Sequence, residues 1–69
     1  MTTKERILEE ALTLFSRQGY KVTGVRQIAA AVGIRDASLY KHFKSKEDIF
    51  RGIMALIEEH IGGFSPELG

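Results

Sequence analysis

The sequence predicts an all-α domain, and three observations indicate this fold class. Apolar residues recur every three or four positions in four separate segments, which is the spacing of one face of a helix. Glycine follows three of these segments at the point where the periodicity stops. The chain has 69 residues, 43% of them hydrophobic, and a single proline, which suits one compact domain with its own core.

The first helix is expected over residues 3–18. Thr2 and Glu5 have the spacing of a capping box, in which each side chain accepts a backbone N–H of the other residue. Gly19 is placed to end the helix in the left-handed conformation. One face, which we expect to enter the core, gathers the apolar residues Ile7, Leu8, Ala11, Leu12, Leu14 and Phe15.

Two short helices are expected next, over residues 25–32 and 36–43. Gly33 ends the first of them, and Leu39 and Phe43, four positions apart, form the inward pair of the second. The apolar face of the 25–32 helix consists of Val25, Ile28, Ala29 and Val32.

The residues that precede these two short helices are weak caps. Gly24 stands before the 25–32 helix, with Thr23 as a substitute cap. Arg35 stands before the 36–43 helix and cannot accept from its N–H groups, so Asp36 is the substitute, which would start that helix one residue late.

A longer fourth helix is expected over residues 46–61. Ser45 and Asp48 have capping-box spacing, and the acids in its first turn suit the positive end of the helix dipole. We expect Ile49, Phe50 and Ile53 to form core against the first helix. The outer end of the apolar stripe has no partner in the predicted bundle, so we expect it to contact a further domain or another subunit through Leu56, Ile57, His60 and Ile61.

Residues 28–42 have the pattern of two helices that cross steeply through a short turn. Ala29 offers a small side chain where the backbones approach, and Gly33, four positions later, lies in the turn. Below the crossing we expect an apolar hub of Ile28, Val32, Ile34 and Leu39. The sequence therefore predicts a three-helix, homeodomain-like helix-turn-helix unit followed by a longer amphipathic helix.

Charge is distributed unevenly along the chain. The net charge of the whole chain is only +1, but residues 17–46 hold seven basic residues against one acid, a net charge of +6. Residues 1–16 carry a net −1 and residues 47–69 a net −4. A basic block within an otherwise acidic chain favours a polyanionic partner.

Three motifs resemble one known family. The segments "ALTLFSRQGY", "VRQIAAAVGI" and above all "SLYKHFKSKEDIF" are similar to the amino-terminal DNA-binding domain of TetR-type (tetracycline-repressor-like) transcriptional regulators, over about residues 4–57. The resemblance implies that residues 1–45 form the DNA-binding unit. It also implies that residues 46–61 lead to an effector-binding and dimerisation domain absent from this chain, with residues 62–69 as a tail.

The resemblance makes the 36–43 helix the recognition helix of the major groove. Lys41 is then expected to donate to guanine, Ala37 to meet a thymine methyl group and Asp36 to accept from cytosine. Tyr40, His42 and Lys46 match positions that usually contact phosphates, and Arg26 matches a base or phosphate contact. The full set expected to contact DNA is Arg26, Arg35, Asp36, Ala37, Ser38, Tyr40, Lys41, His42, Lys44 and Lys46.

Plainer interpretations stay open for several of these residues. Asp36 also suits a helix cap, His42 a surface position, and Lys44 and Lys46 a solvated helix junction. For the whole chain, the alternative is a helical protein-interaction module whose basic face meets an acidic protein. His60 is expected to be a packing residue.

Other classes of function are disfavoured. The chain has no cysteine, and its two histidines are eighteen positions apart, so neither a metal site nor another cofactor is expected. No nucleophile, base and orienting group share a face, so no catalytic residues are expected. The sequence also lacks a signal peptide and a membrane span, which favours a cytoplasmic protein. The resemblance implies a repressor that binds a palindromic double-stranded operator as a homodimer and meets a small-molecule effector through the absent domain.

Overall fold

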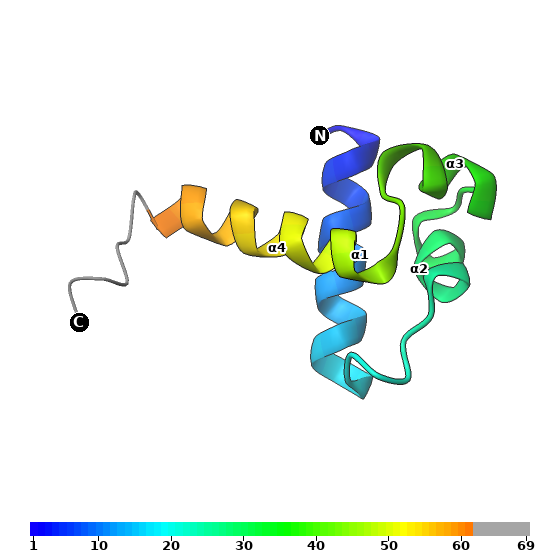
Figure 1. The fold of residues 1–69 in the computed structure, drawn as a ribbon, viewed down its shortest axis with the longest axis horizontal. Helices are drawn as coiled ribbons and strands as arrows, with labels where there is room; N and C mark the ends of the chain where they lie inside the picture. Colours follow the sequence, from blue (N-terminus) through cyan, green and yellow to red (C-terminus); the bar gives the residue numbers. More distant parts are fainter. Residues whose placement is uncertain (62–69) are drawn as a thin grey trace.

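The computed structural model describes the backbone of residues 1–61 and the side chains of residues 1–59. This described part contains four helices and no strand, which confirms the all-α fold class. The helices are α1 (Thr3–Gln18), α2 (Val25–Val32), α3 (Asp36–His42) and α4 (Lys46–Ile61), as Figure 1 shows. The predicted tail, residues 62–69, lies outside the described residues.

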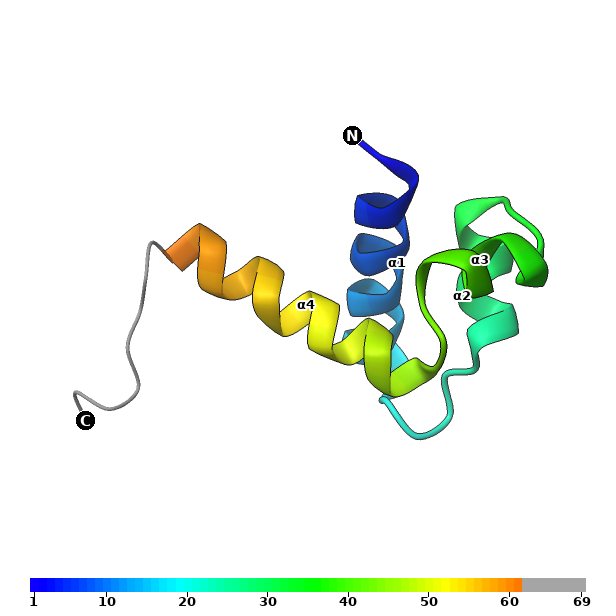
Figure 2. The ribbon, with the colours of Figure 1, turned by 45° about the horizontal axis from the view of Figure 1, so that its top comes forward.

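Helix α1 is the centre of the bundle. It packs against α2 on one side and α4 on the other, and α3 packs against α2. Helix α4 crosses α1, and its last turns extend beyond the other three helices in both views (Figures 1 and 2).

The core draws buried apolar side chains from all four helices and from the residue that follows α3. The inward pair Leu39 and Phe43 is buried as predicted. The other core residues are Ile7, Leu8, Ala11, Ile28, Ala29, Val32, Ile49 and Ile53. Two predicted core residues, Leu12 and Phe50, are exposed instead. Leu12 lies at the edge of its helical face, and Phe50 contacts Tyr20 outside the core.

Both ends of α1 are held by local hydrogen bonds. The predicted capping box is present: the Glu5 N–H donates to Thr2 Oγ1 at 3.1 Å, and the Thr2 N–H donates to Glu5 Oε1 at 2.8 Å. Gly19 ends the helix with φ 98° and ψ 152°, so the prediction of a left-handed residue is wrong. This extended conformation at positive φ is open almost only to glycine and sends the chain directly into the loop.

Thr23 organises that loop and does not cap α2. Its side chain is buried, donates to the Gly19 carbonyl at 2.7 Å and accepts from Gln18 Nε2 at 3.0 Å. The hydroxyl is therefore already engaged with the end of α1. Gly24 occupies the cap position of α2 without a side-chain hydrogen bond, so the substitute cap expected at Thr23 is wrong.

The turn between α2 and α3 forms as predicted. Gly33 is left-handed at φ 89°, and the N–H of Ile34 donates to the Ala29 carbonyl at 3.0 Å. The N–H of Gly33 donates to the Ala30 carbonyl at 3.2 Å, which completes a Schellman motif. Ala29 is fully buried at this point, so a small residue stands where the helices meet.

Helix α3 begins at Asp36, as the predicted range 36–43 has it, but its cap and its last residue differ from the prediction. Arg35 is the capping residue, without a side-chain hydrogen bond, and Asp36 is the first helical residue, so Asp36 is not the cap. The helix ends at His42, one residue early, because Phe43 turns to an extended conformation while its N–H still donates to Leu39.

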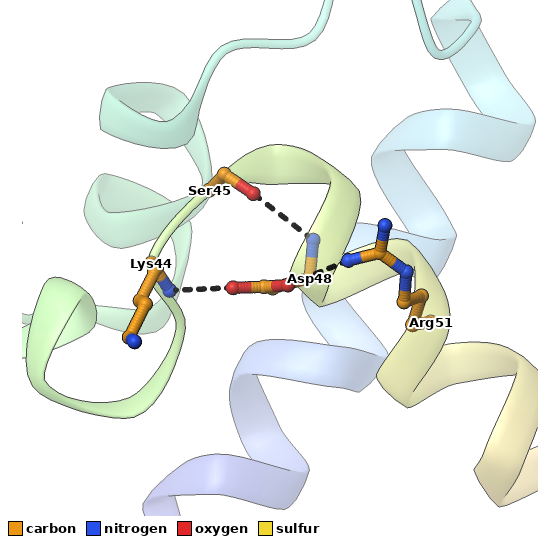
Figure 3. Close-up of polar contacts among 4 residues, drawn as sticks. All are labelled: Lys44, Ser45, Asp48 and Arg51. Atoms are coloured by element: carbon orange, nitrogen blue, oxygen red, sulfur yellow. Dashed lines mark hydrogen bonds and ion pairs between the residues drawn. The ribbon is translucent and has the colours of Figure 1, made fainter.

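Helix α4 begins with a modified capping box, drawn in Figure 3. The Asp48 N–H donates to Ser45 Oγ at 3.2 Å, as the spacing predicts. The reciprocal bond comes from Lys44: its N–H donates to the Asp48 carboxylate at 3.2 Å. Arg51 pairs with the other carboxylate oxygen at 2.8 Å, so Asp48 joins the start of α4 to the end of α3.

Gly52 lies on α4 where the Leu8 side chain of α1 packs closely against it, a contact that was not predicted from the sequence. A Cβ atom at this position would lie 2.8 Å from Leu8 Cδ2 and 3.1 Å from Phe43 Cε1. A larger residue at position 52 would therefore require the Leu8 and Phe43 side chains, or the helices themselves, to shift.

Candidate nucleic-acid interface

Helix α3 separates its buried and solvent-facing residues as a recognition helix requires. Leu39 is fully buried beneath it, while Tyr40, Lys41 and His42 are exposed. Ala37 is exposed as well, and Ser38 is half-buried. The predicted set on this helix thus reaches solvent, apart from partial cover at Ser38 and Asp36.

Four exposed basic residues belong to this part of the molecule: Arg26 on α2, Arg35 before α3, Lys41 on α3 and Lys44 after it. Within residues 1–59, only Arg26 of these four pairs with an acid. Figure 3 shows the Lys44 side chain directed away from Asp48, while only its backbone N–H meets that carboxylate. The surface is therefore cationic and largely uncompensated.

Arg26 and Asp36 form an ion pair across the two helices of the helix-turn-helix. Arg26 Nε lies 3.3 Å from Asp36 Oδ2, and the two side chains are 89% and 46% exposed. From the sequence, the two residues were predicted as separate DNA contacts. No spacing rule links the second residue of α2 to the first of α3, so only the helix crossing brings them together.

Lys46 is placed differently from the other lysines of the motif. Its Nζ donates to the Tyr20 carbonyl at 2.7 Å and to the Lys21 carbonyl at 3.4 Å, and lies 4.3 Å from the centre of the Tyr20 ring. The ammonium group thus joins the start of α4 to the loop after α1. Its expected phosphate contact would have to compete with these bonds.

Tyr20 is the central residue of a small aromatic cluster that was not predicted from the sequence. Its ring centre lies 5.0 Å from that of Phe15 and 5.6 Å from that of Phe50. Burial raises the pKa of Tyr20 above 10.0, nearby Glu47 raises it further, and Arg51 lowers it. The phenol is therefore neutral at physiological pH.

A pair of glutamines adds a second link between α1 and α2. Gln18 Nε2 donates to Gln27 Oε1 at 2.8 Å, and Gln27 Nε2 donates back at 3.3 Å. With the Thr23 hydroxyl, these amides hold α2 against the end of α1. Two polar residues nine positions apart gave no sequence signal for this contact.

The expected partner surface on α4 is described only in part. Leu56 and Ile57 are half-buried and pack against the core, so the expectation that they have no partner within the bundle is wrong. Phe50 and Met54 on the same helix are exposed. The side chains of His60 and Ile61 lie outside the described residues.

The described residues hold no group of three or more histidine, cysteine, aspartate or glutamate side chains suited to a metal ion. A shallow groove of about 230 Å³ lies where α1 and α4 diverge from their contact, and it is lined by Lys4, Glu5, Leu8, Gly52, Ala55, Leu56 and Glu59. It contains no hydroxyl or thiol nucleophile. None of the helices described for residues 1–61 is long and apolar enough to cross a membrane.

Comparison with known proteins gives consistent matches. The model of the family described as bacterial regulatory proteins, tetR family, matches residues 7–53. The HTH-type transcriptional regulator AcrR of Shigella flexneri is 45% identical over 60 residues, which cover 87% of this chain and 28% of that protein. The biofilm operon icaADBC negative transcriptional regulator IcaR of Staphylococcus epidermidis is 46% identical over 48 residues, 70% of this chain and 26% of that protein. The chain thus spans little more than a quarter of the length of these relatives.

Proposed function

The chain belongs to the tetR family of bacterial regulatory proteins, and on this premise we propose that it binds double-stranded DNA in a sequence-specific manner as the DNA-binding domain of a transcriptional repressor. The observation that carries the proposal is the exposed basic face of α3 above a buried Leu39. The relatives AcrR and IcaR are both named as transcriptional regulators, and IcaR as a negative one. Transcriptional regulators are not a class of enzymes.

Helix α3 enters the major groove in this proposal. Lys41 donates to guanine O6 and N7, Ala37 meets a thymine methyl group, and Ser38 lies at the edge of the contact. Tyr40 and His42 face the phosphates on either side of the groove. These roles are supported by the exposure of Ala37, Tyr40, Lys41 and His42 on the same short helix.

Phosphate neutralisation supplies most of the affinity. Arg35 and Lys44 are unpaired among the described residues and are not assigned to a base, whereas the charge of Arg26 is offset by Asp36. These two charges predict that the logarithm of the binding constant falls with the logarithm of salt concentration with a slope of about −2 per bound copy. A specific contact by a few side chains then adds to this nonspecific affinity.

We propose further that the protein acts as a homodimer on a palindromic operator in the cytoplasm. One copy presents a single recognition helix, and two half-sites about one helical turn of DNA apart, or a multiple of it, need two copies. The outer end of α4, with Leu56 and Ile57 and the undescribed side chains of His60 and Ile61, leads toward the domain that forms the dimer and binds a small effector.

The proposal is tested by selecting bound duplexes from a randomised library and measuring their affinity over a series of salt concentrations. Lys41→Ala should weaken binding to the selected duplex by roughly 5- to 150-fold, the range expected for the loss of one base contact. Arg17→Ala removes the same charge from the far end of α1 (Figure 1) and should leave affinity nearly unchanged.

Two outcomes would contradict the proposal. If no duplex were enriched, and binding did not depend on salt, the chain would not be a DNA-binding domain. Retained affinity in both Lys41→Ala and Tyr40→Phe would show that α3 is not the recognition helix, and a basic face for an acidic protein partner would then be the better interpretation.

A further inference from the structure

The Arg26–Asp36 ion pair places an acid on the face that we assign to DNA. Asp36 is the one acid among the eight charged residues between positions 17 and 46, and it lies in the first turn of the proposed recognition helix. An unpaired carboxylate there would repel phosphates. Because it lies 3.3 Å from Arg26, it meets a cation of the same surface instead.

The Arg26–Asp36 ion pair is expected to contribute little to the stability of the fold. Both side chains are substantially exposed, at 89% and 46%. Ion pairs of this kind contribute about 0–1 kcal/mol, since water screens the charges and the long arginine side chain loses freedom. An acid in the first helical turn also stabilises α3 through the helix dipole, but that effect does not require Arg26 as a partner.

The atoms of the contact suggest a further role. Asp36 meets Arg26 through Nε, on one edge of the planar guanidinium. The two terminal nitrogens stay available, because no other acid pairs with Arg26 within residues 1–59. Those nitrogens form the fork that matches guanine O6 and N7 in the major groove. An arginine held at Nε loses less freedom when its fork binds a base.

We propose that Asp36 is a positioning residue that holds Arg26 for a bidentate contact with guanine, and so selects a G·C base pair without touching DNA. The proposal rests on the proposed function and assigns Arg26 a base contact where the resemblance left base and phosphate open. In this proposal Asp36 does not accept a hydrogen bond from cytosine, as was expected from the sequence, because its carboxylate already faces Arg26.

The test is a binding selection from randomised duplexes with the unmodified chain, Arg26→Ala, Asp36→Ala and the double variant. Besides the guanine expected for Lys41, the unmodified chain should enrich a second guanine, and Arg26→Ala should lose the preference at that second position alone. Asp36→Ala should relax it by about tenfold while other positions of the motif stay the same. In the Arg26→Ala background, Asp36→Ala should have no further effect on that position.

Glu47→Ala is the matched control. Glu47 is also an exposed acid in the first turn of a helix, α4, but has no ion pair with Arg26. This variant should keep the full guanine preference. Thermal melting of each variant separates loss of fold from loss of positioning, because a purely structural role for Asp36 would change the melting temperature and not the selected base.

The outcomes distinguish this inference from the proposed function. An enriched motif in which every guanine preference survives in Asp36→Ala, or in Arg26→Ala, would overturn the inference and leave the proposed function intact. The absence of any enriched motif for the unmodified chain would refute both.

Discussion

Replacing Lys46 by methionine tests whether the tether between α4 and the loop after α1 stabilises the domain. The substitution keeps most of the aliphatic stem and removes the ammonium group. It abolishes the hydrogen bonds to the Tyr20 and Lys21 carbonyls, at 2.7 and 3.4 Å, and the contact 4.3 Å from the Tyr20 ring centre. The carbonyls lie in a loop that water reaches, so they are not left buried.

The expected loss of stability follows from these contacts. A hydrogen bond from a charged donor contributes about 1.5 kcal/mol at the lower end of its range, which suits a half-buried lysine. A cation over an aromatic ring adds about 0.5 kcal/mol at a partly exposed site. The total of about 2 kcal/mol should lower the melting temperature of a domain of this size by roughly 10 °C.

Thermal and urea denaturation followed by circular dichroism measure this loss, with Lys44→Met as the control. Lys44 is the neighbouring exposed lysine, and only its backbone N–H takes part in the capping of α4. Its substitution should change stability by less than about 0.5 kcal/mol. DNA titrations with the same variants add a second measurement: Lys44→Met should reduce the salt slope by about 1, and Lys46→Met should not.

The reasoning would be refuted if Lys46→Met were as stable as Lys44→Met and also reduced the salt slope by about 1. Lys46 would then be a phosphate contact, as the family resemblance implies, and the tether would not form in solution.

Three further predictions concern the packing of α1. Gly52→Ala should lower the free energy of unfolding by about 1 kcal/mol, because overpacking at the helix crossing outweighs the gain in helix propensity; a higher melting temperature would contradict this. Thr23→Val should lower the free energy of unfolding by about 1–3 kcal/mol, because the Gly19 carbonyl loses its buried hydrogen-bond donor. The control Thr13→Val, on the exposed face of α1, should change the free energy of unfolding little in the same denaturation assay. Burial raises the pKa of Tyr20 above 10.0 in the folded protein. As pH rises, the unfolded chain therefore loses the Tyr20 phenol proton at a lower pH than the folded protein does. The stability of the unmodified chain relative to Tyr20→Phe should therefore be constant below pH 10 and fall above it in urea denaturation; a difference that stays flat above pH 10 would contradict the shift.

Local pattern was sufficient to predict most of the fold. The four helices follow from apolar periodicity, and the left-handed Gly33 follows from a turn that only a few residues can make. Leu39 and Phe43 were predicted as core because their spacing places both on one side of a short helix. In each case the cause lies within a few residues of its effect.

Contacts between distant segments were not predictable in the same way. Phe50 reads as core in the α4 pattern, yet it is 45% exposed and meets Tyr20 edge-on, because α1 is too narrow to cover the whole stripe. Gly52 gave no sequence signal of its role. Its reason is the proximity of Leu8, and that depends on the helix crossing.

The basic block shows the same limit for the candidate site. Counted along the sequence, residues 17–46 carry a net charge of +6. In the structure, Lys46 is turned to the Tyr20 carbonyl, Arg17 lies at the far end of α1, and Asp36 offsets Arg26. The pair of Arg26 and Asp36 is already neutral in the net count, so setting aside Arg17 and Lys46 leaves +4, of which only Arg35, Lys41 and Lys44 lie on or next to α3. Charge counted along a chain measures attraction to DNA at a distance, whereas the number of phosphates bound depends on which cations the fold leaves unpaired.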